Sequence, residues 1–207
     1  MILYLVRHGE SEANAEDVHS SGDTPLTRVG REQARKIAAR FRHIALDVIF
    51  SSDQNRAFDT AEEIKERIRK PHIVSKHLRE IRRPSEMQRK SRRDPEMVRI
   101  RNLIARNTKK NWHYSDEENF HDFKTRVAKF LKLFQKRKER HALVVSHGGT
   151  MRILLGLMLF GERDFSQKMF YRLLDVFKLV NTGLTVCEYK DGDWKIRVWN
   201  DHAHLGE

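Results

Sequence analysis

The chain of 207 residues has a single cysteine, Cys187, so no disulfide can form within it. A reducing compartment fits this usage, because small secreted domains usually depend on disulfide pairs. The N-terminal apolar run, Ile2 to Val6, is far too short for a membrane span or a signal peptide, and charged residues follow it at once. We therefore expect a cytoplasmic protein with no membrane attachment.

The sequence also lacks the residue spacings that usually hold metals. It has no HExxH-like motif and no Cys/His cluster, and the pair His202 and His204 stands alone near the C-terminus. Repeats, low-complexity tracts and long flexible linkers are absent as well. We expect one domain over residues 1–207, at most with an insertion, and no metal or other cofactor.

Positive charge, by contrast, is abundant, with 41 Lys and Arg against 29 Asp and Glu and a net charge of +12. Such a balance suggests an anionic partner: a nucleic acid, a membrane surface or a phosphorylated substrate. Solvated Lys and Arg faces are the alternative explanation. Aromatic residues that could stack on bases are few in the basic region, and no nucleic-acid-binding signature is present. Nucleic acid is thus the weaker choice of partner.

Much of the excess charge lies in residues 82–113, which hold eleven Lys and Arg against three acids. Within this segment Asp94-Pro95-Glu96 predicts the start of a helix, because an acid caps the first turn and proline fits there. The segment interrupts the alternation of predicted strands and helices on either side of it. We interpret it as a basic helical insertion.

Three apolar runs end in polar loops, which is the strongest pattern in the chain. Ile2 to Val6 leads into Arg7 and His8, residues 47–50 lead toward Arg56, and residues 142–145 lead into His147. Short apolar runs of this kind predict buried strands. If these strands are parallel neighbours, their carboxyl ends place two histidines and two arginines in one pocket, where ligands bind in open α/β sheets.

The remaining elements follow from periodicity and capping signals. Helices are expected over about residues 28–42, with Thr27 as N-cap, 55–69, 115–140 and 150–160. The last two depend on a capping box at Ser115 to Glu118 and on the apolar stretch after His147. Further strands are expected over 72–75, 179–189 and 194–199, the last two joined by a hairpin at Asp191-Gly192.

Motifs spread along the whole chain resemble one known family. They are Arg7-His8-Gly9-Glu10-Ser11-x-x-Asn14, Asp23-x-Pro25-Leu26-Thr27, Ser51-Ser52-Asp53-x-x-Arg56, Leu78-Arg79-Glu80, Ser146-His147-Gly148-Gly149 and Asn200-Asp201-x-x-His204-Leu205. These blocks are similar, in kind and order, to those of the histidine phosphatases, or phosphoglycerate mutase-like superfamily. The resemblance implies a three-layer α/β/α sandwich with a mostly parallel central sheet, in which an insertion at about 82–113 caps the active site.

The resemblance also implies metal-independent hydrolysis of phosphate monoesters through a phosphohistidine. In this reading His8 is the nucleophile, Glu80 the proton donor and then base, and Arg7, Asn14, Arg56 and His147 bind the phosphate. The residue types suit these tasks. Guanidinium groups match phosphate oxygens, and a histidine can attack phosphorus to form a covalent intermediate. Glu10 is the competing proton donor, because it lies near His8 in sequence.

Some positions depart from the family pattern. Ser20 stands where a glycine is frequent, which weakens the case for a phosphate contact from that loop. Ala13 stands where cofactor-dependent phosphoglycerate mutases usually have Trp, and the surroundings of Glu80 differ from their acid-bearing block. The sequence thus favours a phosphatase acting on a small phosphorylated substrate, and the basic segment suits one that carries several charges. A mutase and a basic polyanion- or RNA-binding module are the alternatives, and the oligomeric state is left open.

Overall fold

A computed structural model describes residues 1–206, which form a six-stranded sheet with the strand order β3-β2-β4-β1-β5-β6. The strands are β1 (Ile2–Arg7), β2 (Val48–Ser51), β3 (His72–Val74), β4 (His141–Ser146), β5 (Leu184–Lys190) and β6 (Asp193–Asp201). The first four in this order are parallel, β5 runs antiparallel to β1, and β6 runs antiparallel to β5. The prediction of a mostly parallel sheet is confirmed.

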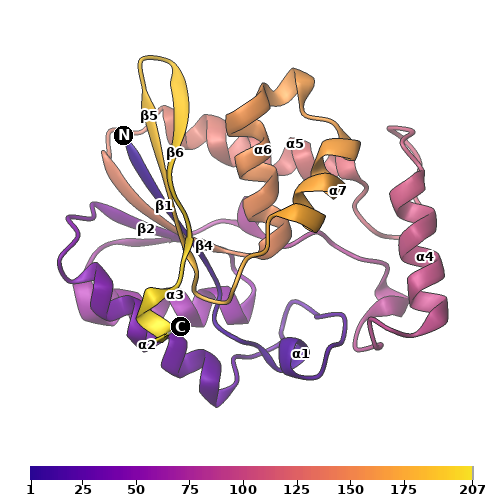
Figure 1. Cartoon of the computed structure of the whole chain (residues 1–207), viewed down its shortest axis with the longest axis horizontal. Helices are drawn as coiled ribbons and strands as arrows, with labels where there is room; N and C mark the ends of the chain where they lie inside the picture. Colours follow the sequence, from indigo (N-terminus) through magenta and orange to yellow (C-terminus); the bar gives the residue numbers. More distant parts are fainter. Residues whose placement is uncertain (207) are drawn as a thin grey trace.

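Helices cover both faces of the sheet, which gives the three expected layers (Figure 1). On one face lie α2 (Arg28–Phe41) and α3 (Asn55–Ile68), and on the other lie α5 (Phe120–Gln135), α6 (Gly148–Asp164) and α7 (Gln167–Val176). Short turns complete the chain: α1 (Glu12–Ala15), η1 (Lys76–Leu78) and η3 (Ala203–Leu205). Within residues 1–206, none of the helices combines the length and the apolar character needed to cross a membrane.

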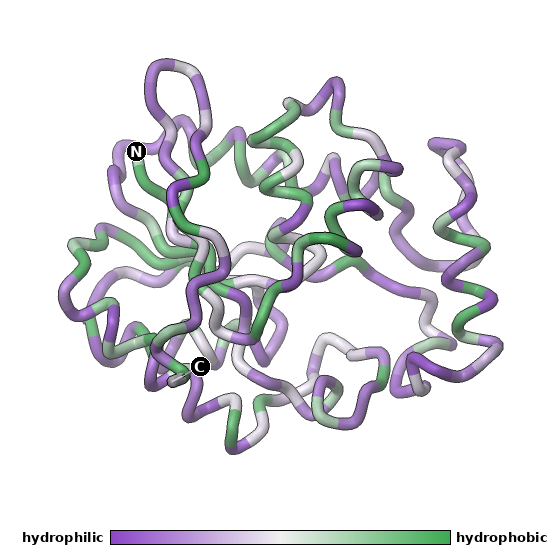
Figure 2. Tube along the Cα trace, viewed as in Figure 1, coloured by the Kyte–Doolittle hydropathy of each residue, from purple (hydrophilic) through white to green (hydrophobic). Residues whose placement is uncertain are grey.

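The alternation of side chains along the strands explains this layering. Ala142 and Val144 of β4 enter the core beneath α5 and α6, whereas Leu143 and Val145 enter the core beneath α2 and α3. Successive side chains on a strand point to opposite faces, so a strand covered on both sides must be apolar throughout. Figure 2 shows the apolar stretches converging on the central strands.

The basic segment forms η2 (Ser85–Met87) and α4 (Pro95–Arg106), and Figure 1 places α4 at the edge of the molecule farthest from the sheet. Asp94 caps α4 as predicted, because its carboxylate accepts hydrogen bonds from the N–H groups of Glu96 and Met97. This part has its own small apolar cluster, separate from the two main cores. The cluster, here called the cover cluster, consists of Met87, Met97, Ile100 and Ile104, with Trp112 and Tyr114 against it.

The prediction for the long helix was wrong at both ends. Helix α5 begins after Asn119, whose side chain accepts from the N–H groups of His121 and Asp122, and it ends at Gln135. The acidic residues 116–118 do not cap this helix. Glu117 accepts the N–H groups of Tyr114 and Ser115 and so stabilises a turn. A side chain that satisfies its own preceding backbone competes with helix formation, which sequence spacing alone does not reveal.

Two differences occur near the C-terminus. Helix α6 runs past Phe160 to a kink at Gly161, and α7 follows it where no helix was expected. The first hairpin strand begins at Leu184 rather than at Leu179, because residues before it turn back toward β1. In that turn Thr182 has a φ of 58° and donates its N–H to the carbonyl of Arg7. The hairpin at Asp191-Gly192 is confirmed, with positive φ at both residues.

Candidate functional site

The carboxyl ends of β1, β2 and β4 meet at one edge of the sheet. Arg7 lies opposite Ser146 in the pairing of β1 with β4, and Ser51 lies opposite Val145 in the pairing of β2 with β4. The residues that follow these strands therefore come together. The ring centroids of His8 and His147 are 5.1 Å apart, and Arg56 enters from the first turn of α3. The predicted convergence of two histidines and two arginines is what the fold produces.

His8 is held in one orientation by hydrogen bonds from both sides. Its Nδ1 lies 2.7 Å from the carbonyl oxygen of Gly9, an acceptor, so Nδ1 carries the proton. Its Nε2 lies 3.3 Å from the donating Nε of Arg56 and therefore presents a lone pair. Burial, followed by the charges of Arg56 and Arg7, lowers the pKa of His8 well below 6.5. The ring is neutral at physiological pH, with Nε2 available as a nucleophile.

The loop that carries His8 is fixed by buried contacts. The N–H of Gly9 donates to the hydroxyl of Thr60 on α3 at 3.0 Å, and the N–H of His8 donates to the carbonyl of Ser146 at 2.9 Å. Gly9 is required here by close packing. A Cβ at that position would stand 2.4 Å from the carbonyl oxygen of Gly30 on α2. The glycine lets the loop lie directly on that helix.

Buried donors next to His8 are free to bind an anion. Among the described residues, both ring nitrogens of His147 and the Nε of Arg7 have no hydrogen-bond partner, although they are shielded from solvent. Buried polar groups are normally satisfied, so a cluster of free ones suggests a ligand. Burial lowers the pKa of Arg7 and of Arg56 to about 10, which leaves both guanidinium groups charged at neutral pH. The cluster therefore favours a small, highly charged anion such as a phosphate group.

The carboxyl group of Glu80 lies at the N-terminus of α6, directly after His147. Its Oε2 accepts the N–H of Gly149 at 2.9 Å, and its Oε1 accepts the N–H of Ile81 at the same distance. A Cβ at Gly149 would stand 2.3 Å from Oε1, so only glycine allows this approach. The negative charge of Glu80 acts on Arg7 and Arg56, which places the carboxyl group in the same electrostatic neighbourhood.

Glu10 and Asn14 have other attachments. The Oε1 of Glu10 accepts from the hydroxyl of Thr27 at 2.7 Å, at the start of α2, so this carboxylate is held at that helix. The amide oxygen of Asn14 accepts from the N–H of Ser11 and from the amide of Asn181. The structure thus brings Glu80, rather than Glu10, to the cavity beside Arg56, and Asn14 lies on α1, the short helix that follows the His8 loop.

Three further residues support this arrangement and were not singled out from the sequence. The amide oxygen of Gln54 accepts from both the N–H of Glu80 and the Nη2 of Arg56. The amide of Asn181 donates to the carbonyl of His8 at 2.8 Å. Arg152 donates to the carbonyl of Gly148 and to two carbonyls of the α7 region. Of the three, only Arg152 could have been noticed in the sequence, because it is the one charged residue in the apolar stretch 150–160.

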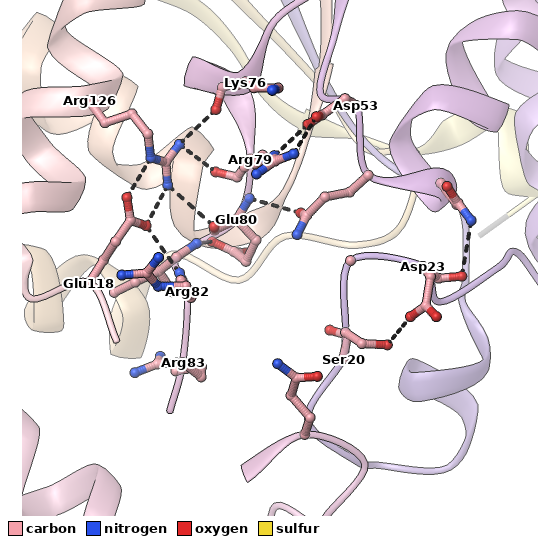
Figure 3. A pocket seen from close by; sticks show the side chains of 16 residues that line it. Ser20, Asp23, Asp53, Lys76, Arg79, Glu80, Arg82, Arg83, Glu118 and Arg126 are labelled. Atoms are coloured by element: carbon pink, nitrogen blue, oxygen red, sulfur yellow. Dashed lines mark hydrogen bonds and ion pairs between the residues drawn. The ribbon is translucent and has the colours of Figure 1, made fainter. Parts of the chain in front are cut away.

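Two adjoining cavities border this cluster at Glu80, the inner one also at Arg56 and Gly149, whereas Arg7, His8 and His147 do not line them. The inner cavity, of about 240 Å³, is lined by His19, Ser20, Gln54, Arg56, Glu80, Ile81, Arg83, Arg92, Arg101, Gly149, Phe170 and Leu174. The outer cavity, of about 500 Å³, shares Ser20, Gln54, Glu80, Ile81 and Arg83 with it and extends toward Asp53, Arg79, Glu118 and Arg126 (Figure 3). Residues of the basic segment line both cavities, so this segment forms part of their wall.

The outer cavity is polar, and two of its four acids are already paired with arginines. Arg79 donates to both carboxylate oxygens of Asp53, and Arg126 donates to both oxygens of Glu118 (Figure 3). Arg126 also binds the carbonyl of Arg79, next to Glu80. Within residues 1–206 there is no group of three His, Cys, Asp or Glu side chains placed to hold a metal ion. The candidate site therefore consists of cationic and imidazole donors around one carboxyl group.

Comparison with known proteins agrees with this geometry. The family model for the histidine phosphatase superfamily (branch 1) matches residues 3–202. Phosphoglycerate mutase-like protein 4 of Arabidopsis thaliana is 29% identical over 99% of this chain and 87% of its own length. The adenosylcobalamin/alpha-ribazole phosphatase of Escherichia coli is 28% identical over 77% of this chain and 79% of its own length.

The fold is also that of solved structures. The crystal structure of the alpha-ribazole phosphatase from Shigella flexneri superimposes with a TM-score of 0.82 at 24% identity, and the match covers 98% of this chain and 97% of that one. At this identity the likeness concerns the fold alone. The family match, by contrast, extends over nearly the whole chain and includes all the blocks named above except the end of the last one, His204-Leu205. The protein belongs to the histidine phosphatase superfamily.

Proposed function

We propose that the protein hydrolyses phosphate monoesters and that His8 is the nucleophile. The observation that carries this proposal is the state of His8: a buried neutral ring whose Nε2 lone pair points to the donating Nε of Arg56, with Arg7 and His147 beside it. A phosphate ester resists attack because its oxygens repel electron-rich nucleophiles. Positive donors around the nucleophile remove that repulsion and stabilise the charge of the transition state.

In the first step Nε2 of His8 attacks phosphorus, and the bond between phosphorus and the ester oxygen breaks. The departing oxygen takes a proton from the carboxyl group of Glu80. In the second step water attacks the phosphohistidine, gives its proton to Glu80 and releases inorganic phosphate. The protons balance over the two steps, and Glu80 serves as acid and then as base. The guanidinium groups of Arg7 and Arg56 and the ring of His147 hold the phosphate oxygens throughout, with the amide of Asn14 as an additional donor.

Gln54 is a positioning residue in this scheme. One amide oxygen accepts from the backbone of Glu80 and from the guanidinium of Arg56, so it fixes the distance between the proton donor and a phosphate-binding group. Such shared supports keep reacting groups aligned, and small misplacements are costly in rate.

Hydrolysis is favoured over the mutase reaction for a sequence reason and a structural one. Ala13 is small and buried where the mutases usually have Trp, and the inner cavity adjoins the larger, polar outer cavity. Water then has a route to the phosphohistidine. A mutase must instead retain a phosphorylated intermediate near His8 until it accepts the phosphate again.

Trapping of the intermediate tests the proposed function. Protein quenched in base during turnover of a ³²P-labelled monoester should carry phosphate that is stable to base and released by acid. Peptide mapping should place it on His8. Label that survives acid, or that maps to Ser11, would contradict the mechanism.

A second assay addresses the metal and the alternative function. Turnover of p-nitrophenyl phosphate should persist in excess chelator, because Arg7, Arg56 and His147 supply the positive charge. Absence of turnover together with salt-sensitive binding of RNA would favour a polyanion-binding module instead. A cytoplasmic location is also part of the proposal, and it rests on the unpaired, buried Cys187.

A further inference from the structure

We propose that the inner cavity binds a second anionic group of the substrate, either a carboxylate or another phosphate, through Arg83, Arg92 and Arg101. The preferred substrates are then small phosphate monoesters that carry an additional negative charge. This inference rests on the proposed reaction at His8 and names the class of molecule that undergoes it.

The three arginines differ from their neighbours in where they lie. Arg83, Arg92 and Arg101 are partly buried and line the inner cavity. Arg93, in contrast, is bonded to Asp17 with 88% of its side chain exposed. Arg99 is exposed and pairs with Glu96 on the outer side of α4. The basic segment therefore has an inner set of arginines directed to the cavity and an outer set directed to solvent.

His19 gives an independent sign of a binding site among the inner arginines. It is only 8% exposed, it lines the cavity, and its Nε2 has no hydrogen-bond partner among residues 1–206. Its backbone is fixed: the N–H donates to the carbonyl of Lys90, and the carbonyl accepts from Arg89. Arg92 is fixed as well, since its Nε donates to the carbonyl of Val18. A rigid, buried and unsatisfied donor is typical of a site that awaits a ligand.

Arg92 connects this subsite to the place where the phosphate would react. Its charge lowers the pKa of Arg7, His8 and Arg56, and it also lowers the pKa of His19. The guanidinium of Arg92 thus lies within electrostatic range of His8 with its two neighbouring arginines and also of His19. His19 and Arg56 both line the inner cavity, and the Nε of Arg56 lies 3.3 Å from Nε2 of His8. A substrate that binds Arg56 through its phosphate can therefore place a second anion beside His19. At about 240 Å³ this cavity lies at or below the usual range of roughly 300–1,000 Å³ for ligand pockets, which favours a small molecule.

The acids near the cavity determine which charge the rest of the substrate can carry. Among the lining residues of the described chain, Glu80 is the one acid of the inner cavity, and backbone N–H groups already bind both its oxygens. Asp53 and Glu118 of the outer cavity are paired with arginines. In the inner cavity a substrate ammonium group would meet no unbonded carboxylate, whereas a substrate carboxylate there would meet Arg83, Arg92 and Arg101. Phe170 and Leu174 supply an apolar wall for a short carbon skeleton.

The first experiment compares substrates that differ in one group. 3-Phosphoglycerate and O-phosphoserine share a carbon skeleton and a carboxylate, but the second has an ammonium in place of a hydroxyl. Glycerol 3-phosphate lacks the carboxylate, and 2,3-bisphosphoglycerate adds a phosphate. We expect kcat/KM for 3-phosphoglycerate to exceed that for glycerol 3-phosphate by about tenfold or more, since an ionic hydrogen bond contributes roughly 1.5–3 kcal/mol. O-phosphoserine should fall below 3-phosphoglycerate.

The second experiment removes the inner arginines. In the double variant Arg83→Gln/Arg101→Gln, the preference for 3-phosphoglycerate over glycerol 3-phosphate should shrink about tenfold, mainly through KM. The variant Arg106→Gln is the matched control, because it removes one charge from an exposed position of the same α4 helix and should keep the preference. Added salt should lower the preference in wild type more than in the double variant.

The outcomes separate this inference from the proposed function. Absence of turnover and of phosphohistidine with every monoester would overturn the reaction at His8. Turnover of p-nitrophenyl phosphate with equal kcat/KM for 3-phosphoglycerate and glycerol 3-phosphate in wild type would overturn only the second-anion site. If the double variant does not fold, the wild-type ranking still decides. A higher kcat/KM for 2,3-bisphosphoglycerate than for 3-phosphoglycerate would identify the second group as a phosphate.

Discussion

The floor of the candidate site is buried, whereas the basic segment that forms part of the cavity wall, residues 82–113 and here called the cover, is largely exposed. On the floor His8, Arg56 and His147 are 4%, 2% and 0% exposed, and they follow strands at the centre of the sheet. In the cover, residues 82–113, most arginines lie at least partly in solvent. The floor thus supplies buried polar groups to the site, and the cover supplies partly exposed positive charges.

The difference shows which region can perform chemistry and which can select substrates. Burial on the floor lowers the pKa of both histidines and strengthens every charge interaction there. Charges in the cover are screened by water and salt, so each contributes less energy but acts over the entrance. Changes on the floor should therefore affect kcat, and changes in the cover should affect KM.

The largest effect should come from the nucleophile. His8→Ala removes the covalent step and should lower kcat by at least ~10³-fold. Arg106→Gln in the cover should leave kcat on p-nitrophenyl phosphate near the wild-type value. Both are measured as steady-state rates at saturating substrate. A loss of only a few-fold in His8→Ala would mean that the floor does not carry the reaction.

A smaller loss is expected when the proton donor is changed. Glu80→Gln keeps the shape of the side chain but cannot supply a proton, so alkyl phosphates should slow far more than aryl phosphates, whose leaving oxygens need little protonation. The ratio of kcat for glycerol 3-phosphate to kcat for p-nitrophenyl phosphate measures this directly. Glu10→Gln is the control and should preserve the ratio. The reverse pattern would transfer the acid role to Glu10.

The same two regions show what sequence could and could not predict. The floor was predictable because strand-end loops follow from apolar runs, and parallel pairing brings such loops together. The residues that hold this floor in place could not be predicted from the sequence. Gln54 and Asn181 act through side-chain hydrogen bonds that reach residues far along the chain, Glu80 and His8 respectively. No spacing rule encodes those contacts.

The basic composition of the cover could be predicted from the sequence, but which of its side chains line the cavity could not. Eleven basic residues in 82–113 indicated an anionic partner. Which of them line the cavity depends on how the cover cluster packs and on the backbone bonds that tie residues 89–92 to residues 17–19. Arg92 and Arg93 are adjacent in sequence, yet one lines the cavity and the other is largely in solvent. Charge counts alone assign them the same role.

Acid should weaken the floor before it affects the carboxylates. Burial lowers the pKa of His8 and His147 well below 6.5, and that of His19 to about 4. In the unfolded chain these histidines titrate near 6.5. As pH falls below that value the unfolded state takes up protons first, so the stability that is fully present above pH 6.5 is progressively lost.

Thermal unfolding measured between pH 8 and pH 5 checks this expectation. The melting temperature should be level above about pH 7 and should fall below about pH 6.5, the range in which unfolded histidines titrate. In His19→Gln the decline should be shallower, because one of the depressed groups is gone. A melting temperature that is constant from pH 7 to pH 5 would show that the histidines are not buried as neutral rings.

The smallest effect on turnover is expected inside the cover. Ile100, at 1% exposure, belongs to the cover cluster, whereas Ile49, at 0%, lies in the main core beneath α2 and α3. Ile49→Ala should lower the free energy of unfolding by about 2–5 kcal/mol, as buried Ile→Ala changes usually do. Ile100→Ala creates a similar cavity in a cluster of only four buried side chains. If that cluster opens by itself, the loss appears as local unfolding of α4 rather than of the whole domain.

Hydrogen exchange followed by mass spectrometry distinguishes these results. In Ile100→Ala, exchange should rise in peptides that contain residues 95–106 and stay at the wild-type level in peptides of β4. In Ile49→Ala, exchange should rise both in the peptides that contain residues 95–106 and in the peptides of β4. The kcat on p-nitrophenyl phosphate should change by less than about twofold in Ile100→Ala, since local opening leaves the floor intact. Equal increases in α4 and β4 would mean that cover and floor unfold as one unit, and the two regions would then differ in charge but not in stability.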